Sequence, residues 1–568
     1  MALVVVAGWV GRRLWFFSDD WNIYAEYYRG NLLEPFNGHL SLLPAGIYQL
    51  LFNTVGVGSY LPYRVVGLVA LVVLGFQLVR FAGSRVSTVV AVLAVAAVMW
   101  NSFGTTNVMF PFLMNFSLPI AALLAVWWHL DRIESSAVGD GRQDHRSRSG
   151  DGAAAVSDAQ STTRAGGPGR SAADSEPPTG NLVAIGLWLA VALAASGLGV
   201  VAALAVGVEL LVRRSRARVW VAWSVSTVLW LGWWLSHREA NEISTDVGQV
   251  VPYLLRMLWA GPTSIAAGNP WLGLLIASLL LAAIARVVIN SRRVDPRVLG
   301  ALAAAFAFAA LTSLTRQGTF PPIPPDELRY GWTIGAYVVC AAVALAPALV
   351  RSMPRELPGW WAPVRLCGVV LATLVLVVGA YRLIDEMGDW SDQVAEAAPG
   401  LRTNLYAAEA VGADRMGPEE VIGPLSFVPV HATDYLDAVA TVGSPLAGAA
   451  AGGIGGRADQ REAASSLLFD NIGLVAPEPV VGDVPADLTG CTTEEIVAPG
   501  GFLDIVELAG DADALEVSRF GAPPRSLDVP TGLSRLQMPE DAPVATSAAE
   551  PYRVSVPAST SRICGPQG

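Results

Sequence analysis

Two adjacent carboxylates, Asp19 and Asp20, follow directly on an apolar segment and are the residues best suited to acid–base chemistry. Their aromatic neighbours in the sequence are Trp15, Phe16, Phe17 and Trp21. Partial burial raises the pKa of a carboxyl group, and an adjacent like charge separates the two pKa values. Such a carboxylate can accept a proton from an alcohol. Because neighbours on a helix point about 100° apart, we expect one Asp to activate an acceptor and the other to orient a metal or a sugar.

A structural role explains the same pair equally well. Ser18 can cap the N-terminus of a helix that starts at the membrane surface. The helix dipole favours acidic residues in the first turn of such a helix. On these residues alone, both interpretations remain open.

Several other polar positions are candidates for binding an anionic group. Arg329 and Tyr330 open an apolar stretch in PPIPPDELRYGW, where a guanidinium can bind a phosphate as a fork and stabilise its charge. The structural alternative is an Arg that extends to the membrane interface beside a Tyr of the aromatic belt. His39 and Arg64 are further candidates for binding phosphate or substrate, although a single His near an interface is more often a satisfied polar contact. Arg316 is interpreted as solvated surface.

Metal chemistry is left open by these residues. Asp19, Asp20 and His39 are compatible with a divalent metal site, because carboxylate oxygens suit hard cations, but a metal-free base fits equally well. The sequence contains no GxxxxGK[ST], HExxH, CxxC or GxSxG motif. Soluble nucleotide-driven chemistry is therefore unsupported.

The chain that must position these residues is predominantly apolar. Its 568 residues are 53% hydrophobic and only 15% charged, and the mean hydropathy is +0.46, which a water-soluble globule of this length could hardly accommodate. A helix needs about 20 mainly apolar residues to cross a bilayer. About eleven transmembrane helices are predicted, at 1–17, 61–82, 86–103, 112–130, 182–196, 198–212, 219–236, 271–289, 298–315, 331–350 and 364–384. The two short spans around Gly197 have an alternative, a broken or re-entrant hairpin.

Arginine placement predicts the orientation of these spans in the cytoplasmic membrane. All basic residues are Arg, and those between spans gather in loops that fall on one side, namely 80–85, the linker after 132, 213–218, 292–297 and 351–355. The positive-inside rule makes that side cytoplasmic, together with the N-terminus. The loop after the first span, the loop 316–330 and everything after Asp385 are then extracytoplasmic.

Composition also predicts the domain organisation. Residues 1–384 form the membrane region, within which 131–180 contain almost nothing apolar and are expected to be a disordered cytoplasmic loop. Residues 385–568 are expected to form an extracytoplasmic α+β or β-sandwich domain. Its short strands are predicted in VIGPLSFVPV, FLDIVELAG and PYRVSVP, and residues 443–456 are predicted to be a flexible loop. In an oxidising compartment Cys491 and Cys564 can pair, which is worth roughly 4 kcal/mol in the chain-entropy model.

The N-terminal region resembles a known family of membrane enzymes. It contains an Asp-Asp pair directly after the first apolar helix, an aromatic-rich loop helix, and then Gly38-His39 and Pro44 ahead of a polytopic region. This order of features resembles the GT-C superfamily of membrane glycosyltransferases, of the bacterial, actinobacterial type. The resemblance covers about residues 1–384, and Arg329-Tyr330 matches an Arg-Tyr pair that recurs in such enzymes. GT-C enzymes transfer a sugar from a polyprenyl-phosphate donor outside the cytoplasmic membrane, with inversion, and use an acidic residue of the first external loop as base.

The resemblance implies a hexosyl- or pentosyltransferase that acts in cell-envelope biogenesis. The donor would be a polyprenyl-phosphate sugar and the acceptor a cell-envelope glycan, a lipid or a protein, with Asp19 or Asp20 as base and Arg329 on the departing phosphate. Two alternatives remain, a transporter or flippase of lipid-linked intermediates and a non-catalytic envelope scaffold. Near absence of Asp and Glu from the spans disfavours ion-coupled transport. The net charge of -11 disfavours nucleic acid as a partner.

Overall fold

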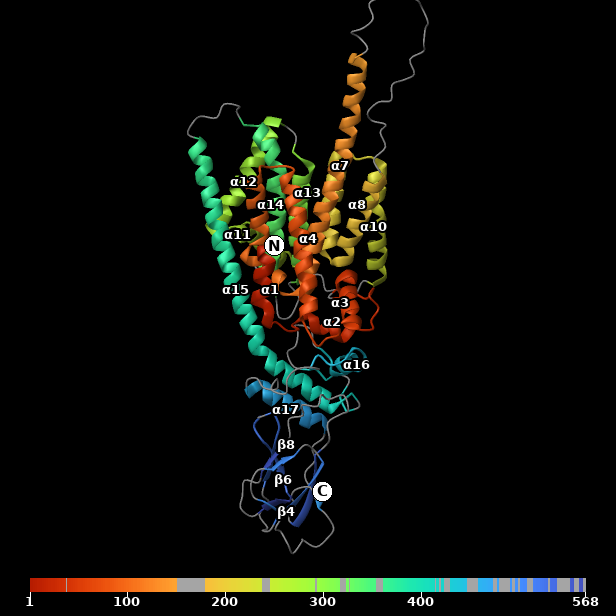
Figure 1. Cartoon of the computed structure of the whole chain (residues 1–568), viewed down its shortest axis with the longest axis vertical. Coiled ribbons are helices and arrows are strands. Elements are labelled where there is room, and N and C mark those ends of the chain that lie inside the picture. Colours follow the sequence, from red (N-terminus) through yellow and green to blue (C-terminus); the bar gives the residue numbers. More distant parts are fainter. Residues whose placement is uncertain are drawn as a thin grey trace, which may run out of the picture. The chain divides into compact units, whose positions relative to one another are not determined.

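The computed structural model divides into two compact units (Figure 1). The helical unit comprises Met1–Val10, Leu32–Pro44 and Arg64–Gly388, and the mixed unit comprises Gly11–Asn31, Ala45–Tyr63 and Asp389–Gly568. The described residues are 1–36, 38–150, 179–237, 246–291, 294–316, 323–325, 327–353, 361–413, 415–417, 420–422, 430–446, 458–472, 478–479, 491–492, 496–498, 501–507, 514–520, 522–529, 532–538, 552–555 and 561–564.

The helical unit is built from apolar helices that run side by side (Figure 1). Its main elements are α1 (Ala2–Val10), α4 (Leu61–Gly83), α5 (Thr88–Met99), α6 (Thr105–Met109), α7 (Met114–Gly150), α8 (Thr179–Ala195), α9 (Leu198–Arg213), α10 (Ala217–His237), α11 (Val247–Ile265), α12 (Pro270–Ser291), α13 (Pro296–Arg316), α14 (Leu328–Arg351) and the first part of α15 (Trp361–Val411). The most extensive packing joins α7 to α8, α11 to α14 and α9 to α13.

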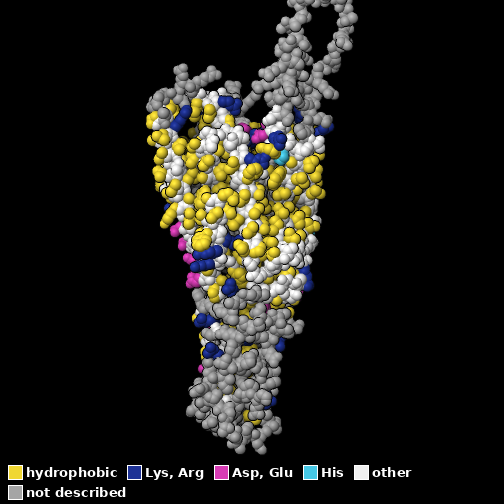
Figure 2. Space-filling model, in the orientation of Figure 1, with side chains coloured by type: hydrophobic (Ala, Val, Ile, Leu, Met, Phe, Trp, Pro, Cys, Tyr) yellow, Lys and Arg dark blue, Asp and Glu magenta, His cyan; other side chains and the backbone are white. Residues whose placement is uncertain are grey.

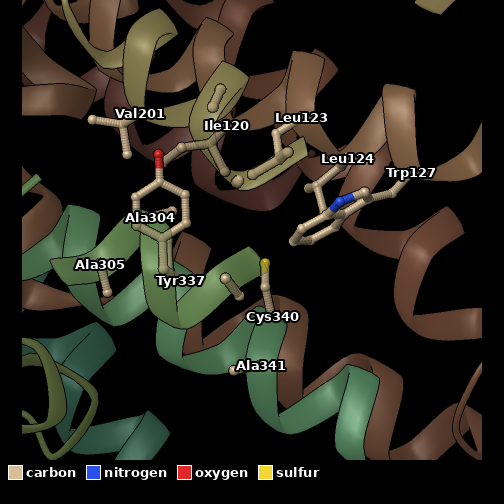
Figure 3. Close-up of a cluster of buried hydrophobic side chains, with 14 of the residues drawn as sticks. Ile120, Leu123, Leu124, Trp127, Val201, Ala304, Ala305, Tyr337, Cys340 and Ala341 are labelled. Atoms are coloured by element: carbon tan, nitrogen blue, oxygen red, sulfur yellow. The ribbon is translucent and has the colours of Figure 1, made fainter. Parts of the chain in front are cut away.

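Small residues let the central helices approach closely. A Cβ atom at Gly300 of α13 would lie 2.8 Å from the carbonyl oxygen of Ala205 on α9. A Cβ atom at Gly261 of α11 would overlap the side chain of Ile334 on α14. Between the helices lies a buried core of aliphatic and aromatic side chains, part of which is drawn in Figure 3, where Tyr337 and Cys340 of α14 lie near Ile120 and Leu124 of α7. Close packing of small residues is what holds helices together where lipid surrounds them.

The outer surface of this unit is apolar, as a lipid-facing surface must be. In α10, α12 and α15 only 11% of the residues in each apolar window are buried. Figure 2 shows hydrophobic side chains covering the helices on the visible face. Hydrocarbon solvates such side chains, and a helix satisfies most of its backbone polar groups internally. The chain is therefore a multi-pass membrane protein.

The predicted number of eleven spans is not confirmed. Among the described residues, seven helices are long and apolar enough to cross a membrane, or eight if α5 and the bent segment Ser102–Met109 form one span. The bend of 49° follows Asn101, whose side chain accepts a hydrogen bond from the backbone N–H of Phe103 and so starts a new turn. The nine residues of α1 reach only about 14 Å.

The two segments predicted around Gly197 form two separate helices, α8 and α9, of 17 and 16 residues. Two other differences concern a helix that was not predicted and one that is longer than predicted. The structure also contains α11, which hydropathy missed because Pro252, Pro262 and Arg256 interrupt its apolar face. In addition, α7 continues to Gly150 through the start of the loop predicted to be disordered, where no proline interrupts it, while residues 151–178 of that loop lie outside the described residues.

Three of the arginines predicted to share one side do lie at one end of the helical unit. Arg85 pairs with Asp131 at 2.5 Å, and Arg297 pairs with the other oxygen of Asp131. Arg213 pairs with Glu209 at 2.8 Å, and Arg297 also reaches Glu209 at 3.5 Å. Glu209 is fully buried, so these partners compensate a charge that would otherwise be costly. The turn after α4 and the helices α7, α9 and α13 are thereby joined through charged groups.

The mixed unit combines helices from both ends of the chain with two antiparallel sheets. Its helices are α2 (Asp19–Tyr27), most of α3 (Leu42–Thr54), the end of α15, α16 (Ala432–Val442) and α17 (Ala458–Ile472). One sheet has the order β1 (Glu478–Pro479), β7 (Gly532–Met538), β4 (Gly501–Glu507), β9 (Ser561–Cys564) and β2 (Cys491–Thr492). The other has the order β3 (Ile496–Ala498), β8 (Tyr552–Ser555), β5 (Ala514–Ser518) and β6 (Arg525–Asp528).

The C-terminal region is therefore of the α+β type among its described residues. Strand predictions in FLDIVELAG and PYRVSVP are confirmed by β4 and β8, whereas most of VIGPLSFVPV and of the predicted loop 443–456 lies outside the described residues. Arg519 anchors the sheets to α15: it is fully buried, and its guanidinium lies 4.5 Å from the centroid of Tyr552 and 5.7 Å from that of Tyr406. Cys491 and Cys564 are direct partners in the register of β2 and β9.

Candidate functional site

Asp20 sits at the centre of a hydrogen-bonded cluster in the mixed unit. Its Oδ1 accepts a hydrogen bond from the Tyr48 hydroxyl at 2.5 Å, and its Oδ2 accepts one from the Tyr60 hydroxyl at 2.6 Å. The backbone N–H of Phe17 donates to the same Oδ2 at 3.1 Å. The carboxyl group is 2% exposed, so three donors occupy a group that solvent barely reaches.

The pKa of Asp20 is raised to about 6, chiefly by burial and to a smaller extent by the negative charge of Asp19. The hydrogen bonds from Tyr48, Tyr60 and the Phe17 N–H act in the opposite direction, because they stabilise the charged form. Desolvation outweighs them. The sequence-based expectation of a carboxyl group with a raised pKa is thus met at Asp20.

Asp19 is the more accessible carboxylate of the pair. It is half-buried, it opens α2, and as the neighbour of Asp20 on a helix it points in a different direction. Ser18 occupies the N-cap position, but its side chain makes no capping hydrogen bond, and its φ of 52° is unusual for a residue with a side chain. The hydrogen bond from the Phe17 N–H to Asp20 spans this strained turn.

The aromatic rings that neighbour the pair in the sequence pack against one another and against Tyr60. The Phe16 ring contacts Tyr60 with centroids 4.8 Å apart, and the Trp15 ring contacts Trp21 at 5.1 Å. The guanidinium of Arg402, from the end of α15, lies 4.7 Å from the Trp15 ring. A rigid, water-poor wall of this kind is the cause of the raised pKa.

Arg329 lies in the first turn of α14, in the helical unit. Its Nε is 3.9 Å from Oε1 of Glu327, and its guanidinium lies 5.4 Å from the Tyr330 ring centroid. Within the described part of the chain, the buried Nε–H has no hydrogen-bond partner. Tyr330 is buried against Phe308, with ring centroids 5.8 Å apart. The guanidinium thus keeps donor capacity beyond one weak ion pair.

A second arginine, which the sequence did not single out, accompanies Arg329. Arg316, at the end of α13, is half-buried and is not the solvated surface residue that was expected. The charges of Arg316, Glu327 and Arg329 all act on the hydroxyl of Tyr253, and that hydroxyl donates to the carbonyl of Ile323 at 2.9 Å. Two guanidinium groups and one carboxylate near this hydroxyl form a basic cluster with a net positive charge. Only folding brings the ends of α13 and α14 together with α11.

His39 joins this basic cluster as a neutral group. Burial, together with the positive charge of Arg316, lowers the pKa of His39 to about 4. A tight turn holds the residue, since Phe36 and His39 exchange backbone hydrogen bonds and Gly38 adopts a φ of 75° that favours glycine. A Cβ atom at Gly197 would lie 2.9 Å from His39 Nδ1, so the break between α8 and α9 makes room for the imidazole.

Arg64 has a packing role that the sequence did not reveal. It is 5% exposed and donates to the carbonyl oxygen of Ala7 at 2.7 Å, which ties α4 to α1. Of the predicted site residues, Asp19 and Asp20 belong to the mixed unit, and His39, Arg64, Arg329 and Tyr330 belong to the helical unit. The tyrosines that bind Asp20 were not predicted, because nothing local marks them.

Metal ligation finds little support in the geometry. Within the described ranges, no group of three or more His, Cys, Asp or Glu side chains is arranged to hold a metal ion. Asp20 already accepts three hydrogen bonds, which leaves few lone pairs for a cation.

Comparisons with known proteins leave the family open. No protein-family model and no curated protein matches the chain. Among solved structures, the chain is similar to ArnT from Cupriavidus metallidurans in the apo state, with 15% identity, a TM-score of 0.41, and coverage of 76% of this chain and 82% of that chain. Because both the identity and the TM-score are low, this likeness carries no argument about function.

Proposed function

We propose that the chain is a membrane glycosyltransferase of the GT-C type, which uses a polyprenyl-phosphate sugar and acts on an extracytoplasmic acceptor of the cell envelope. The observation that carries the proposal is the buried carboxyl group of Asp20, which two tyrosines hold beside the more accessible Asp19 at the start of α2. Residues 1–384 form the catalytic membrane region and residues 385–568 the extracytoplasmic domain.

Asp19 is the general base in this proposal. The acceptor hydroxyl attacks the anomeric carbon, its proton passes to the Asp19 carboxylate, and the bond from that carbon to the phosphate oxygen breaks with inversion. Asp20 has both oxygens engaged by Tyr48, Tyr60 and the Phe17 N–H, so its role is to hold the turn that presents Asp19. A base typically contributes about 100-fold to 10,000-fold to the rate.

Arg329 and Arg316 bind the donor phosphate. A planar guanidinium donates two parallel hydrogen bonds to a phosphate and stabilises the charge that grows on it as the sugar departs. Support comes from the unpartnered Nε–H of Arg329, among the described residues, and from the nearby charge of Arg316. His39 is neutral at pH 7 and forms a hydrogen bond to the acceptor or to the donor phosphate. Tyr330 and Arg64 support the helix ends that carry these groups.

Transfer of a radiolabelled sugar from defined polyprenyl-phosphate donors by the purified full-length protein tests this function. We expect product with at least one donor and loss of product in Asp19→Asn. If no donor yields product, while the protein binds lipid-linked sugars or moves them between leaflets of a vesicle, the transporter interpretation replaces the transferase. If it neither binds nor moves them, the scaffold interpretation does.

A further inference from the structure

A second buried carboxyl group, Glu409, lies in the mixed unit at the end of α15. It is fully buried, and its Oε1 accepts hydrogen bonds from the Tyr435 hydroxyl at 2.8 Å and from the Ser444 hydroxyl at 2.6 Å. Its Oε2 has no hydrogen-bond partner among the described residues. Burying a carboxyl group costs free energy, so we expect Glu409 to have a specific structural role at this position.

Glu409 fixes the turn that follows α16. Gly443 ends that helix with a φ of 95°, a conformation that side chains rarely adopt. Ser444, held by Glu409, accepts a hydrogen bond from the Leu446 N–H at 3.0 Å. The carbonyl oxygen of Gly443 then accepts a hydrogen bond from Tyr24 at 2.6 Å. Tyr24 lies on α2, one helical turn after Asp20.

A chain of packed rings continues from Glu409 to the Asp pair. Its first partner, Tyr435, has its ring 5.7 Å from that of Tyr24. The Tyr24 ring is 5.7 Å from Phe52, and Phe52 is 5.9 Å from Tyr48, which donates to Asp20. All of these residues belong to the mixed unit. Close-packed interiors transmit a displacement because they cannot deform smoothly.

We propose that Glu409 is a positioning residue for the Asp pair: through Tyr435, Ser444 and Tyr24 it ties the C-terminal domain to α2 and sets the orientation of Asp19. Only the catalytic consequence rests on the proposed function. The C-terminal domain then has a defined role in the transferase, since its α16 turn is part of the support for the general base.

Hydrogen exchange of the α2 amides in the purified full-length protein measures this coupling directly. Glu409→Ala removes the acceptor of two hydroxyl groups, so we expect the α2 peptide, residues 19–27, to exchange about 3-fold to 10-fold faster. Glu409→Gln retains a carbonyl acceptor and should exchange like the wild type. Tyr24→Phe should accelerate exchange in the same peptide, because it removes the bond to Gly443.

Tyr63→Phe is a matched control. Tyr63 also donates to a glycine carbonyl, that of Gly56 at 2.9 Å, but it has no hydrogen bond to the α16 turn. Loss of the Tyr63 hydroxyl should therefore leave the hydrogen exchange of α2 unchanged. Equal α2 exchange in Glu409→Ala and the wild type, with α15 and α16 still protected, would overturn the inference. Should Glu409→Ala not fold, Ser444→Ala and Tyr24→Phe decide the matter by the same readout.

Transfer kinetics separate positioning from a purely structural role. Glu409→Ala should lower kcat about 10-fold or more with an unchanged KM for the polyprenyl-phosphate donor, shift the pH midpoint of kcat, and be rescued by Gln. A proportional loss of active protein, with kcat per folded molecule and pH midpoint unchanged, would contradict positioning. A wild type inactive with every donor defeats the proposed function, whereas the exchange experiment still decides the coupling.

Discussion

Tyr48 donates its hydroxyl hydrogen to Asp20 across 2.5 Å although 28 residues separate them. With Tyr60, which donates to the other oxygen, it makes Asp20 a buried acceptor and leaves Asp19 as the accessible carboxylate. Adjacent residues of one type thus have different environments, and substitutions at the two positions should have different consequences.

Asp19→Asn and Asp20→Asn should separate catalysis from stability. Asp19→Asn should lower transfer about 100-fold to 10,000-fold and change the free energy of unfolding by less than ~0.5 kcal/mol. Asp20→Asn should also destabilise the protein, by about 1–3 kcal/mol, because the amide keeps only one accepting oxygen and leaves one of the two tyrosine hydroxyls without its acceptor. Radiolabel transfer and thermal unfolding in detergent measure the two effects. Full transfer in Asp19→Asn would refute the assignment of the base.

Stability should depend on pH through Asp20. Its pKa rises from 3.8 in the unfolded chain to about 6 in the folded protein, so between these values the folded state binds more protons. The free energy of unfolding of the wild type should therefore fall as pH rises from about 4 to about 6, by about 3 kcal/mol at most. Thermal unfolding of the wild type and of Asp20→Asn across this pH range measures the effect, because the variant lacks the titrating carboxyl group. A pH-independent difference between the two proteins would contradict burial of the carboxyl group.

Arg329→Lys should impair donor use despite keeping the charge. An ammonium group is a point donor and cannot form the planar fork on a phosphate, so we expect KM for the donor to rise about tenfold, which corresponds to ~1.4 kcal/mol. Arg316→Lys should act in the same direction. Arg351→Lys, at the other end of α14, is the control and should leave KM unchanged. Equal KM values for all four proteins would remove the basic cluster from the donor site.

The two ends of α14 should lie on opposite sides of the membrane. In a Cys367→Ser background, which removes the exposed native thiol, Glu327→Cys should react with an impermeant maleimide in intact cells. Ser352→Cys, just beyond the other end of the helix, should react only after permeabilisation. The opposite pattern would invert the orientation that the arginines predict.

Cys491 and Cys564 should be linked in the exported protein. As direct partners on antiparallel strands they have Cα atoms about 4.5–5.5 Å apart, within the range that a disulfide requires. Non-reducing peptide mapping should find the linked pair, and Cys491→Ser should lower the free energy of unfolding of the C-terminal domain by about 2–4 kcal/mol. Two free thiols in protein isolated from the membrane would refute the pairing.

The amino-acid sequence by itself determined the properties that depend on local composition. Long apolar runs determine a multi-pass membrane protein, and short apolar runs between turn residues determine strands such as β4. A carboxylate pair among aromatic residues determines where a raised pKa is found. These features are encoded within some 20 residues. Burial and periodicity act on neighbours, so local sequence suffices to predict them.

The tertiary structure decided which side chains meet. Tyr48 and Tyr60 bind Asp20, Gly197 makes room for His39, and Glu409 reaches Tyr435, from positions that no local pattern connects. The number of spans also depended on the folded structure. The prediction rested on counts of apolar residues, whereas the hydrogen bond to the Asn101 side chain divides one apolar segment into two helices. A hydrogen bond requires two atoms at one distance and angle, and only the packed chain specifies that geometry.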